Sequence, residues 1–185
     1  MLAIKKILVP TDLSNISLST IAYAISLAKK HAAEVTVLHI LPSKAIDESF
    51  APGYITDDLI APAGAPTDAG RQSNRDNVVE RNQRRVHDFL HQKFGPDILK
   101  SVKINALVRF GRTAKEVVAA AKEERSDLVV MTSLRSGLTR LLRGTFTEWI
   151  IGRSPCPVLS IQPAAEVRTE QDERVSVKLM DKWAA

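Results

Sequence analysis

The chain has 185 residues, of which 44% are hydrophobic and 25% charged, and its formal net charge is +5 at pH 7. This length suits one compact domain with accessory segments, and this composition is ordinary for a soluble globular protein. No apolar run approaches the roughly 18 residues of a membrane span, so no membrane segment is expected. The basic residues form no dense blocks with interleaved aromatics, which argues against nucleic acid and favours a small anionic ligand such as a phosphate.

The N-terminus and the cysteine content indicate the compartment. The first residues, MLAIKKILVPTD, contain a short apolar run, but the Pro-Thr-Asp that follows is not a small-residue cleavage site. No signal peptide is therefore expected. Cys156 is the single cysteine, so no internal disulfide can form, and a reducing compartment, by default the cytoplasm, is predicted.

The first third of the chain predicts a strand, a helix and a second strand. KKILVP (5–10) is a continuous apolar run, typical of a parallel strand that is buried on both faces, with Ile7, Leu8 and Val9 in the core. The segment 17–33 has helical spacing, and Asp12 or Ser14 could cap this helix. Its apolar positions are Leu18, Ile21, Ala22, Ala24 and Ile25. EVTVLHILP (34–42) predicts the second buried strand.

A long segment follows the second strand. Residues 43–77 contain several Pro and Gly and show little helical period, and a loop of this length is usually functional or disordered. We expect a mobile loop. The alternative is a lid or a partner-contact element, for which the apolar anchors would be Phe50, Tyr54, Ile55 and Leu59.

The remaining elements alternate between helix and strand. Helices are predicted at 86–94, 113–125 and 146–153, and strands at 101–111, 127–132 and 156–161. The alternation predicts an α/β fold, a doubly wound open five-stranded parallel sheet of Rossmann-like type with helices on both faces. Ligands of such sheets bind outside the carboxyl ends of the strands, where the strand order reverses. The tail from Gln162 is charged and then amphipathic, which is typical of an edge strand or of disorder.

Residues with useful chemistry gather at the predicted strand ends. Thr11 and Asp12 directly follow the first strand, where a carboxylate can accept hydrogen bonds from a ribose or a base, and Pro10 stiffens the turn. The structural alternative is that Asp12 only caps the first helix. Gly144 and Thr145 are placed at the start of the last helix, where free N–H groups attract anions, although Gly-Thr is also a common cap.

Other candidate sites carry little weight. His87 and His91 lie four residues apart on a helix with Asp88 between them, but no third ligand is evident, so no metal is expected. His39 is interpreted as a hydrogen-bonded strand histidine, and Cys156 as a small buried apolar residue. No nucleophile and general base stand out as a pair, so no catalytic residue and no enzyme activity are predicted.

Three segments together resemble the universal stress protein family: KKILVPTDLS, EVTVLHILP and the stretch 111–161, which closes with PCPVLSI. The resemblance covers 5–161 apart from the loop. It implies a family domain at 1–163 that contains the loop 43–77, followed by a C-terminal extension at 164–185. It also implies the five-stranded α/β fold and a homodimer formed through the last strand, Pro157 to Ile161. Some members of the family bind ATP or AMP and others do not.

The glycine motif of the nucleotide-binding members is incomplete here. Their loop after the fourth strand reads Gly-x2-Gly-x9-Gly-[Ser/Thr]. Counting back from Gly144 places Met131 at the first glycine and Leu134 at the second. Aligning by the fourth strand instead places Thr132 at the first glycine and leaves the loop one residue short. A leucine or threonine forced into a left-handed conformation costs ~1–2 kcal/mol. The loop is therefore expected to differ from that of the family.

The resemblance still implies a set of ligand contacts for ATP or AMP. Asp12 would bind the ribose or base, the backbone of Ile40 would bind adenine, and basic side chains would hold the phosphates. The full set of positions is Pro10, Thr11, Asp12, Ile40, Met131, Thr132, Arg135, Gly144, Thr145 and Phe146, together with Arg140 and Arg143. Two functions follow. The favoured one is an adenine-nucleotide-binding protein of the stress response, and the alternative is a dimeric interaction module that binds no nucleotide and recruits an unknown protein partner.

Overall fold

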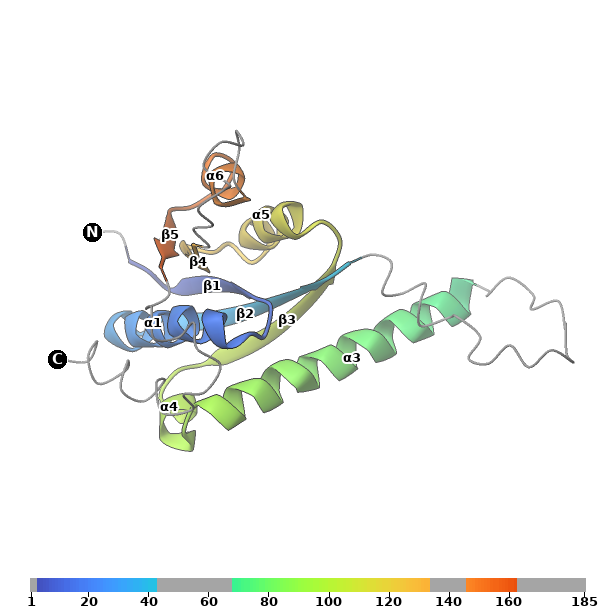
Figure 1. Cartoon of the computed structure of the whole chain (residues 1–185), viewed down its shortest axis with the longest axis horizontal. Helices are drawn as coiled ribbons and strands as arrows, with labels where there is room; N and C mark the ends of the chain where they lie inside the picture. The colour runs from blue at the N-terminus through green and yellow to red at the C-terminus, as the bar shows by residue number, and fades with distance from the viewer. Residues whose placement is uncertain (1–2, 43–67, 134–145, 163–185) are drawn as a thin grey trace, which may run out of the picture.

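The computed structural model describes residues 3–42, 68–133 and 146–162, and its sheet confirms the predicted fold class. Five parallel strands lie in the order β3-β2-β1-β4-β5 (Figure 1). The strands are β1 (Lys6–Thr11), β2 (Glu34–Leu41), β3 (Ile104–Phe110), β4 (Leu128–Thr132) and β5 (Val158–Ile161).

Helices cover both faces of this sheet (Figure 1). The cluster on one face joins α1 and α3 to β1 and β2, through Ile25, Val86 and Val35 among others. The cluster on the other face joins α5 and α6 to the central strands, through residues such as Val117 and Ile150. The helices of the described segments are α1 (Asn15–His31), α3 (Asp68–Lys93), α4 (Pro96–Lys100), α5 (Thr113–Glu123) and α6 (Phe146–Ile151).

The central strand β1 shows why continuous apolar runs form the middle of this sheet. Ile7 and Val9 pack toward α1 and α3, while Leu8 packs toward the opposite face, and all three side chains are at most 1% exposed. A strand covered on both faces has no solvent side, so its sequence does not alternate with polar residues. The predicted apolar positions of α1 are also buried.

The predicted loop 43–77 is wrong in its last third, because α3 already begins at Asp68. The first described buried apolar residue on this helix is Val78, and Val86 and Leu90 follow on the same face. The ten residues from Asp68 to Asn77 extend the helix beyond the sheet (Figure 1). Propagation of an existing helix needs no apolar period of its own, so periodicity did not reveal this part. The rest of the loop, with its proposed anchors, and the tail from residue 163 lie outside the described residues.

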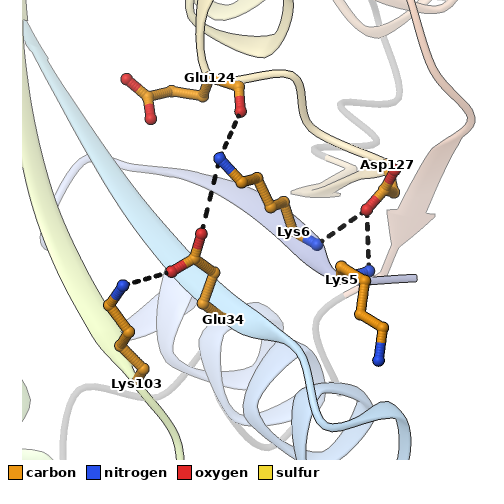
Figure 2. Close-up of polar contacts among 6 residues, drawn as sticks. All are labelled: Lys5, Lys6, Glu34, Lys103, Glu124 and Asp127. Carbon is orange, nitrogen blue, oxygen red and sulfur yellow. Dashed lines mark hydrogen bonds and ion pairs between the residues drawn. The ribbon is translucent and has the colours of Figure 1, made fainter. Parts of the chain in front are cut away.

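A group of polar contacts joins the amino ends of the strands (Figure 2). The Oδ2 atom of Asp127 accepts hydrogen bonds from the backbone N–H groups of Lys5 and Lys6, at 2.8 and 2.9 Å. The ammonium group of Lys6 donates to the carbonyl of Glu124 at 3.2 Å and lies 3.7 Å from Glu34 Oε1. Lys103 Nζ pairs with Glu34 Oε2 at 2.8 Å. These contacts connect β1, β2 and the segments that lead into β3 and β4.

Candidate functional site

The candidate site is a cavity of about 280 Å³ at the carboxyl ends of β2, β1 and β4. From β1 the chain builds outward to β2 and β3, then crosses to β4 and β5 on the other side, so the strand order reverses between β1 and β4. The cavity spans this reversal, where parallel α/β sheets bind ligands. Its lining residues are Pro10, Thr11, Asp12, Ser14, Ile16, Ser17, Leu38, His39, Ile40, Thr113, Met131, Thr132 and Phe146.

The turn after β1 holds Asp12 at the rim of this cavity. Asp12 Oδ1 accepts hydrogen bonds from Ser14 N–H at 3.0 Å and from the Ser14 hydroxyl at 2.6 Å. Leu13 has φ of 60°, and its N–H donates to Thr11 Oγ1 at 3.0 Å. Such left-handed non-glycine residues are uncommon and need local support of this kind.

The same contacts decide whether Asp12 caps α1 or is available to a ligand. Ser14 is the N-cap residue of α1, but no side chain makes a capping hydrogen bond there. Asp12 therefore stabilises the turn before the helix through Oδ1, and it does not cap the helix itself. Its other carboxylate oxygen accepts no hydrogen bond from the described residues, so Asp12 Oδ2 is free to accept bonds from a ligand.

Hydroxyl groups tie the strand ends to α1. Thr11 Oγ1 lies 2.8 Å from Ser17 Oγ, and the Ser17 hydroxyl also donates to the carbonyl of Ser14 at 2.8 Å. Thr132 Oγ1, at the end of β4, lies 2.8 Å from Thr20 Oγ1. These contacts fix the start of α1, whose first turn lines the cavity, against the ends of β1 and β4.

His39 is hydrogen-bonded within the sheet, as the sequence predicted. The side chain is 8% exposed, and its Nδ1 lies 3.1 Å from the carbonyl oxygen of Thr11. Because a carbonyl only accepts, Nδ1 carries the proton in this contact. His39 thus supports the position of Thr11 from the neighbouring strand.

The remaining wall of the cavity is apolar. Among its lining residues Leu38 and Met131 are buried, Ile40 is half-buried, and Phe146 at the first turn of α6 is 45% exposed. Such a mixture of apolar walls and a few polar groups is typical of a site for a small organic molecule.

The cavity brings together most of the residues that the sequence predicted as ligand contacts. The predicted residues in its lining are Pro10, Thr11, Asp12, Ile40, Met131, Thr132 and Phe146. Arg135, Gly144 and Thr145 lie outside the described residues, as do Leu134, Arg140 and Arg143; α6 itself begins at Phe146. The sequence interpretation missed the contributions of Ser14, Ile16, Ser17, Leu38, His39 and Thr113. Thr113 could have been found, because it is the first residue of the helix that follows β3.

The other candidate groups of the sequence lie away from this cavity. His87 and His91 are exposed on α3, and in the described segments no group of three or more metal-binding side chains comes together. Cys156 is half-buried rather than buried, and burial raises the pKa of its thiol. Among the helices of the described segments, none is long and apolar enough to cross a membrane.

The chain as a whole is similar to proteins of one known family. The profile of the Universal stress protein family matches residues 3–162. Universal stress protein MJ0531 of Methanocaldococcus jannaschii is 29% identical over 161 residues, which are 85% of this chain and 82% of that protein. Universal stress protein YxiE of Bacillus subtilis is 27% identical over 160 residues, 85% of this chain and 98% of that protein.

Solved structures show the same fold. The structure of MJ0577 aligns with a TM-score of 0.58 at 22% identity, covering 86% of this chain and 96% of that one. The structure of a universal stress protein in complex with cAMP aligns with a TM-score of 0.53 at 18% identity, covering 88% and 99%. The profile match covers all of the described segments and confirms the resemblance found in the sequence, so the chain belongs to the universal stress protein family.

Proposed function

We propose that this universal stress protein binds an adenine nucleotide, ATP or AMP, in the cavity at the carboxyl ends of β2, β1 and β4. The observation that carries the proposal is the free Oδ2 atom of Asp12 at the rim of a cavity with apolar walls, at the reversal of strand order. A carboxylate oxygen in that position accepts hydrogen bonds from the hydroxyl groups of a ribose. The universal stress protein solved with cAMP supports the choice of an adenine ligand.

The cavity suggests an orientation for the nucleotide. In the proposed orientation the adenine ring lies against Leu38, Ile40 and Met131, which line the cavity. The contact of the base with the backbone of Ile40 is proposed on the strength of the family resemblance. The phosphate end then lies toward β4 and the first turn of α1, where helix N–H groups attract anions. Arg135, Gly144 and Thr145 are proposed as further phosphate contacts, on the strength of the family resemblance.

Isothermal titration with AMP and ATP tests this proposal, and Asp12→Asn is the informative variant. The substitution keeps the shape of the side chain but removes its charge, so it should weaken binding about 10-fold, as expected for loss of one hydrogen bond to a charged group. Wild-type affinity should be looser than about 1 μM, because the glycine motif is incomplete. Asp88→Asn is the matched control, since Asp88 is an exposed residue of α3 outside the cavity lining.

Two outcomes would contradict the proposal. Absence of any binding by wild type at millimolar AMP and ATP would leave the interaction module as the better account. Equal affinities of wild type and Asp12→Asn would show that the nucleotide binds elsewhere.

We infer that the protein binds the nucleotide without catalysis, in a reducing compartment such as the cytoplasm. The described rim holds no nucleophile activated by a general base, since the one histidine that lines the cavity uses Nδ1 in a bond to a backbone carbonyl. The half-buried free thiol of Cys156 suits a reducing environment. Purified protein should therefore leave ATP intact over hours, as judged by release of phosphate.

We also propose that the protein forms a homodimer through β5. This strand is at one end of the sheet, its residues are all half-buried, and no described strand pairs with its outer edge. An open edge of this kind invites pairing with a second chain. The interaction-module alternative would use the same dimer, so dimerisation does not distinguish the two functions.

A further inference from the structure

The hydroxyl groups around the cavity are not equivalent, because each carries only one proton. Five of them belong to Thr11, Ser14, Ser17, Thr20 and Thr132, and the hydrogen bonds among them decide which protons remain for a ligand. A hydroxyl can donate once and can accept more than once. The protons can therefore be assigned one at a time.

The hydroxyls near β1 have no proton left. The Ser14 hydroxyl donates to Asp12 Oδ1, which as a carboxylate oxygen only accepts. The Ser17 hydroxyl donates to the carbonyl of Ser14. In the contact between Thr11 and Ser17, the proton must then come from Thr11, so the Thr11 hydroxyl is also engaged.

The pair formed by Thr20 and Thr132 has the opposite consequence. Thr20 is completely buried in α1, and its hydroxyl makes no other hydrogen bond among the described residues. If Thr132 donated to Thr20, the proton of Thr20 would be buried without an acceptor, which costs about 1–3 kcal/mol. Thr20 therefore donates and Thr132 accepts, which leaves the proton of Thr132 free. Thr132 is half-buried and lines the cavity, so this proton is available to a ligand.

We propose that the Thr132 hydroxyl donates a hydrogen bond to the phosphate of the bound nucleotide, held in place by Thr20. This inference rests on the proposed function and names a residue that favours a nucleotide over a nucleoside in the cavity. Asp12 and Thr132 follow or end the two strands that flank the reversal of strand order, so an acceptor for the ribose and a donor for the phosphate lie on opposite sides of it. By strand alignment, Thr132 stands where the nucleotide-binding members of the family have their first glycine. The hydroxyl donor of Thr132 takes the place of the close backbone contact that a glycine at this position would allow.

The test compares AMP with adenosine, because only AMP carries a phosphate. Thr132→Val keeps the size and branching of the side chain but removes the hydroxyl. It should weaken AMP binding about 10- to 100-fold and change adenosine binding by no more than about twofold. Thr132→Ser should retain most of the affinity for AMP. Thr20→Val should cost less than Thr132→Val, because it removes the partner that orients the hydroxyl and leaves the donor itself.

Thr113→Val is the matched control, because Thr113 lines the cavity from α5. Any loss there should be shared by AMP and adenosine. Equal weakening of both ligands by Thr132→Val would show a structural role only and would overturn the inference, as would unchanged AMP binding.

Wild-type protein provides a second measurement that does not depend on how the variants fold. AMP should bind more tightly than adenosine. Equal affinities would mean that no donor reaches the phosphate, and the inference would fail while the nucleotide site stood. If wild type bound neither ligand, the proposed function would fail and this inference with it.

Discussion

Gly111, which directly follows β3, is constrained both by its backbone conformation and by a neighbouring side chain. Its φ is +148°, a conformation that side chains rarely adopt, and its N–H donates to the carbonyl of Leu41 at 2.9 Å. A Cβ atom there would lie 2.6 Å from Glu116 Oε1. Glu116 cannot move away without cost, because its other carboxylate oxygen accepts a hydrogen bond from Arg109 Nε at 2.8 Å. Position 111 therefore requires glycine both for its backbone and for its close neighbour.

Gly111→Ala should lower the free energy of unfolding by about 1–2 kcal/mol or more, since it combines a strained backbone with a steric contact. Urea denaturation followed by circular dichroism measures this loss. Gly95→Ala is the control, because Gly95 has φ of −64° and nothing within 4 Å of its would-be Cβ atom. The control should change stability by less than about 1 kcal/mol, because the preference of a helix N-cap for glycine over alanine opposes the entropy that alanine removes from the unfolded chain. Equal stability of the two variants would show that Gly111 is not constrained.

At the scale of elements, Glu34 joins β2 to the strands beside it through charge. Lys103 precedes β3 and lies 2.8 Å from Glu34 Oε2, while Lys6 of β1 lies 3.7 Å from Oε1. The hydrogen bond from Lys103 is the main cause that holds the pKa of the Glu34 carboxyl below its ordinary value of 4.5. Figure 2 shows the carboxylate between these two ammonium groups. A carboxyl whose pKa is lowered by folding stabilises the folded state only while it is ionised.

The pH dependence of stability follows from the lowered pKa of Glu34. The contribution of Glu34 is complete above about pH 4.5, and it is lost as the pH falls through the lower pKa of the folded state. Glu34→Gln should therefore be less stable than wild type at pH 7, and the difference should disappear as the pH falls through the lowered pKa of Glu34. Thermal unfolding at a series of pH values measures this. Glu80→Gln is the control, because Glu80 pairs with Arg84 on the exposed surface of α3; a similar pH dependence in both variants would contradict the role of Glu34.

The elements also show which parts of the structure the sequence predicts and why it does not predict the others. Continuous apolar runs located β1 and β4 because buried parallel strands have no polar side. The start of α3 was misplaced because its first ten residues extend beyond the sheet and bear no apolar period. The five-residue helix α4 was missed because it lacks a buried residue. The cavity was located from strand ends, but the bond between Thr20 and Thr132 joins residues 112 positions apart, which no local spacing reveals.

At the scale of the whole molecule, the proposed dimer depends on which backbone groups of β5 point away from the sheet. Val129 N–H donates to the carbonyl of Pro157, and Ser133 N–H donates to the carbonyl of Ile161. The hydrogen-bonding direction of the backbone alternates along a strand. The backbone groups of Pro157, Leu159 and Ile161 therefore face β4, whereas those of Val158 and Ser160 face the outer edge. The outer edge thus offers the N–H of Ser160 to a second chain. The Ser160 hydroxyl is buried and has no hydrogen-bond partner among the described residues, so replacing this side chain removes no bond that the described part of the chain makes.

Ser160→Pro should therefore separate the proposed homodimer into monomers. Proline removes the outward N–H of Ser160 but leaves the hydrogen bonds between β5 and β4 intact, and edge strands tolerate proline in such positions. Light scattering at micromolar concentration should give the mass of a dimer for wild type and of a monomer for the variant, with unchanged circular dichroism. Ser160→Ala is the control, since it keeps the N–H and should remain dimeric. A monomeric wild type, or a Ser160→Pro variant that stays dimeric, would show that β5 does not form the interface.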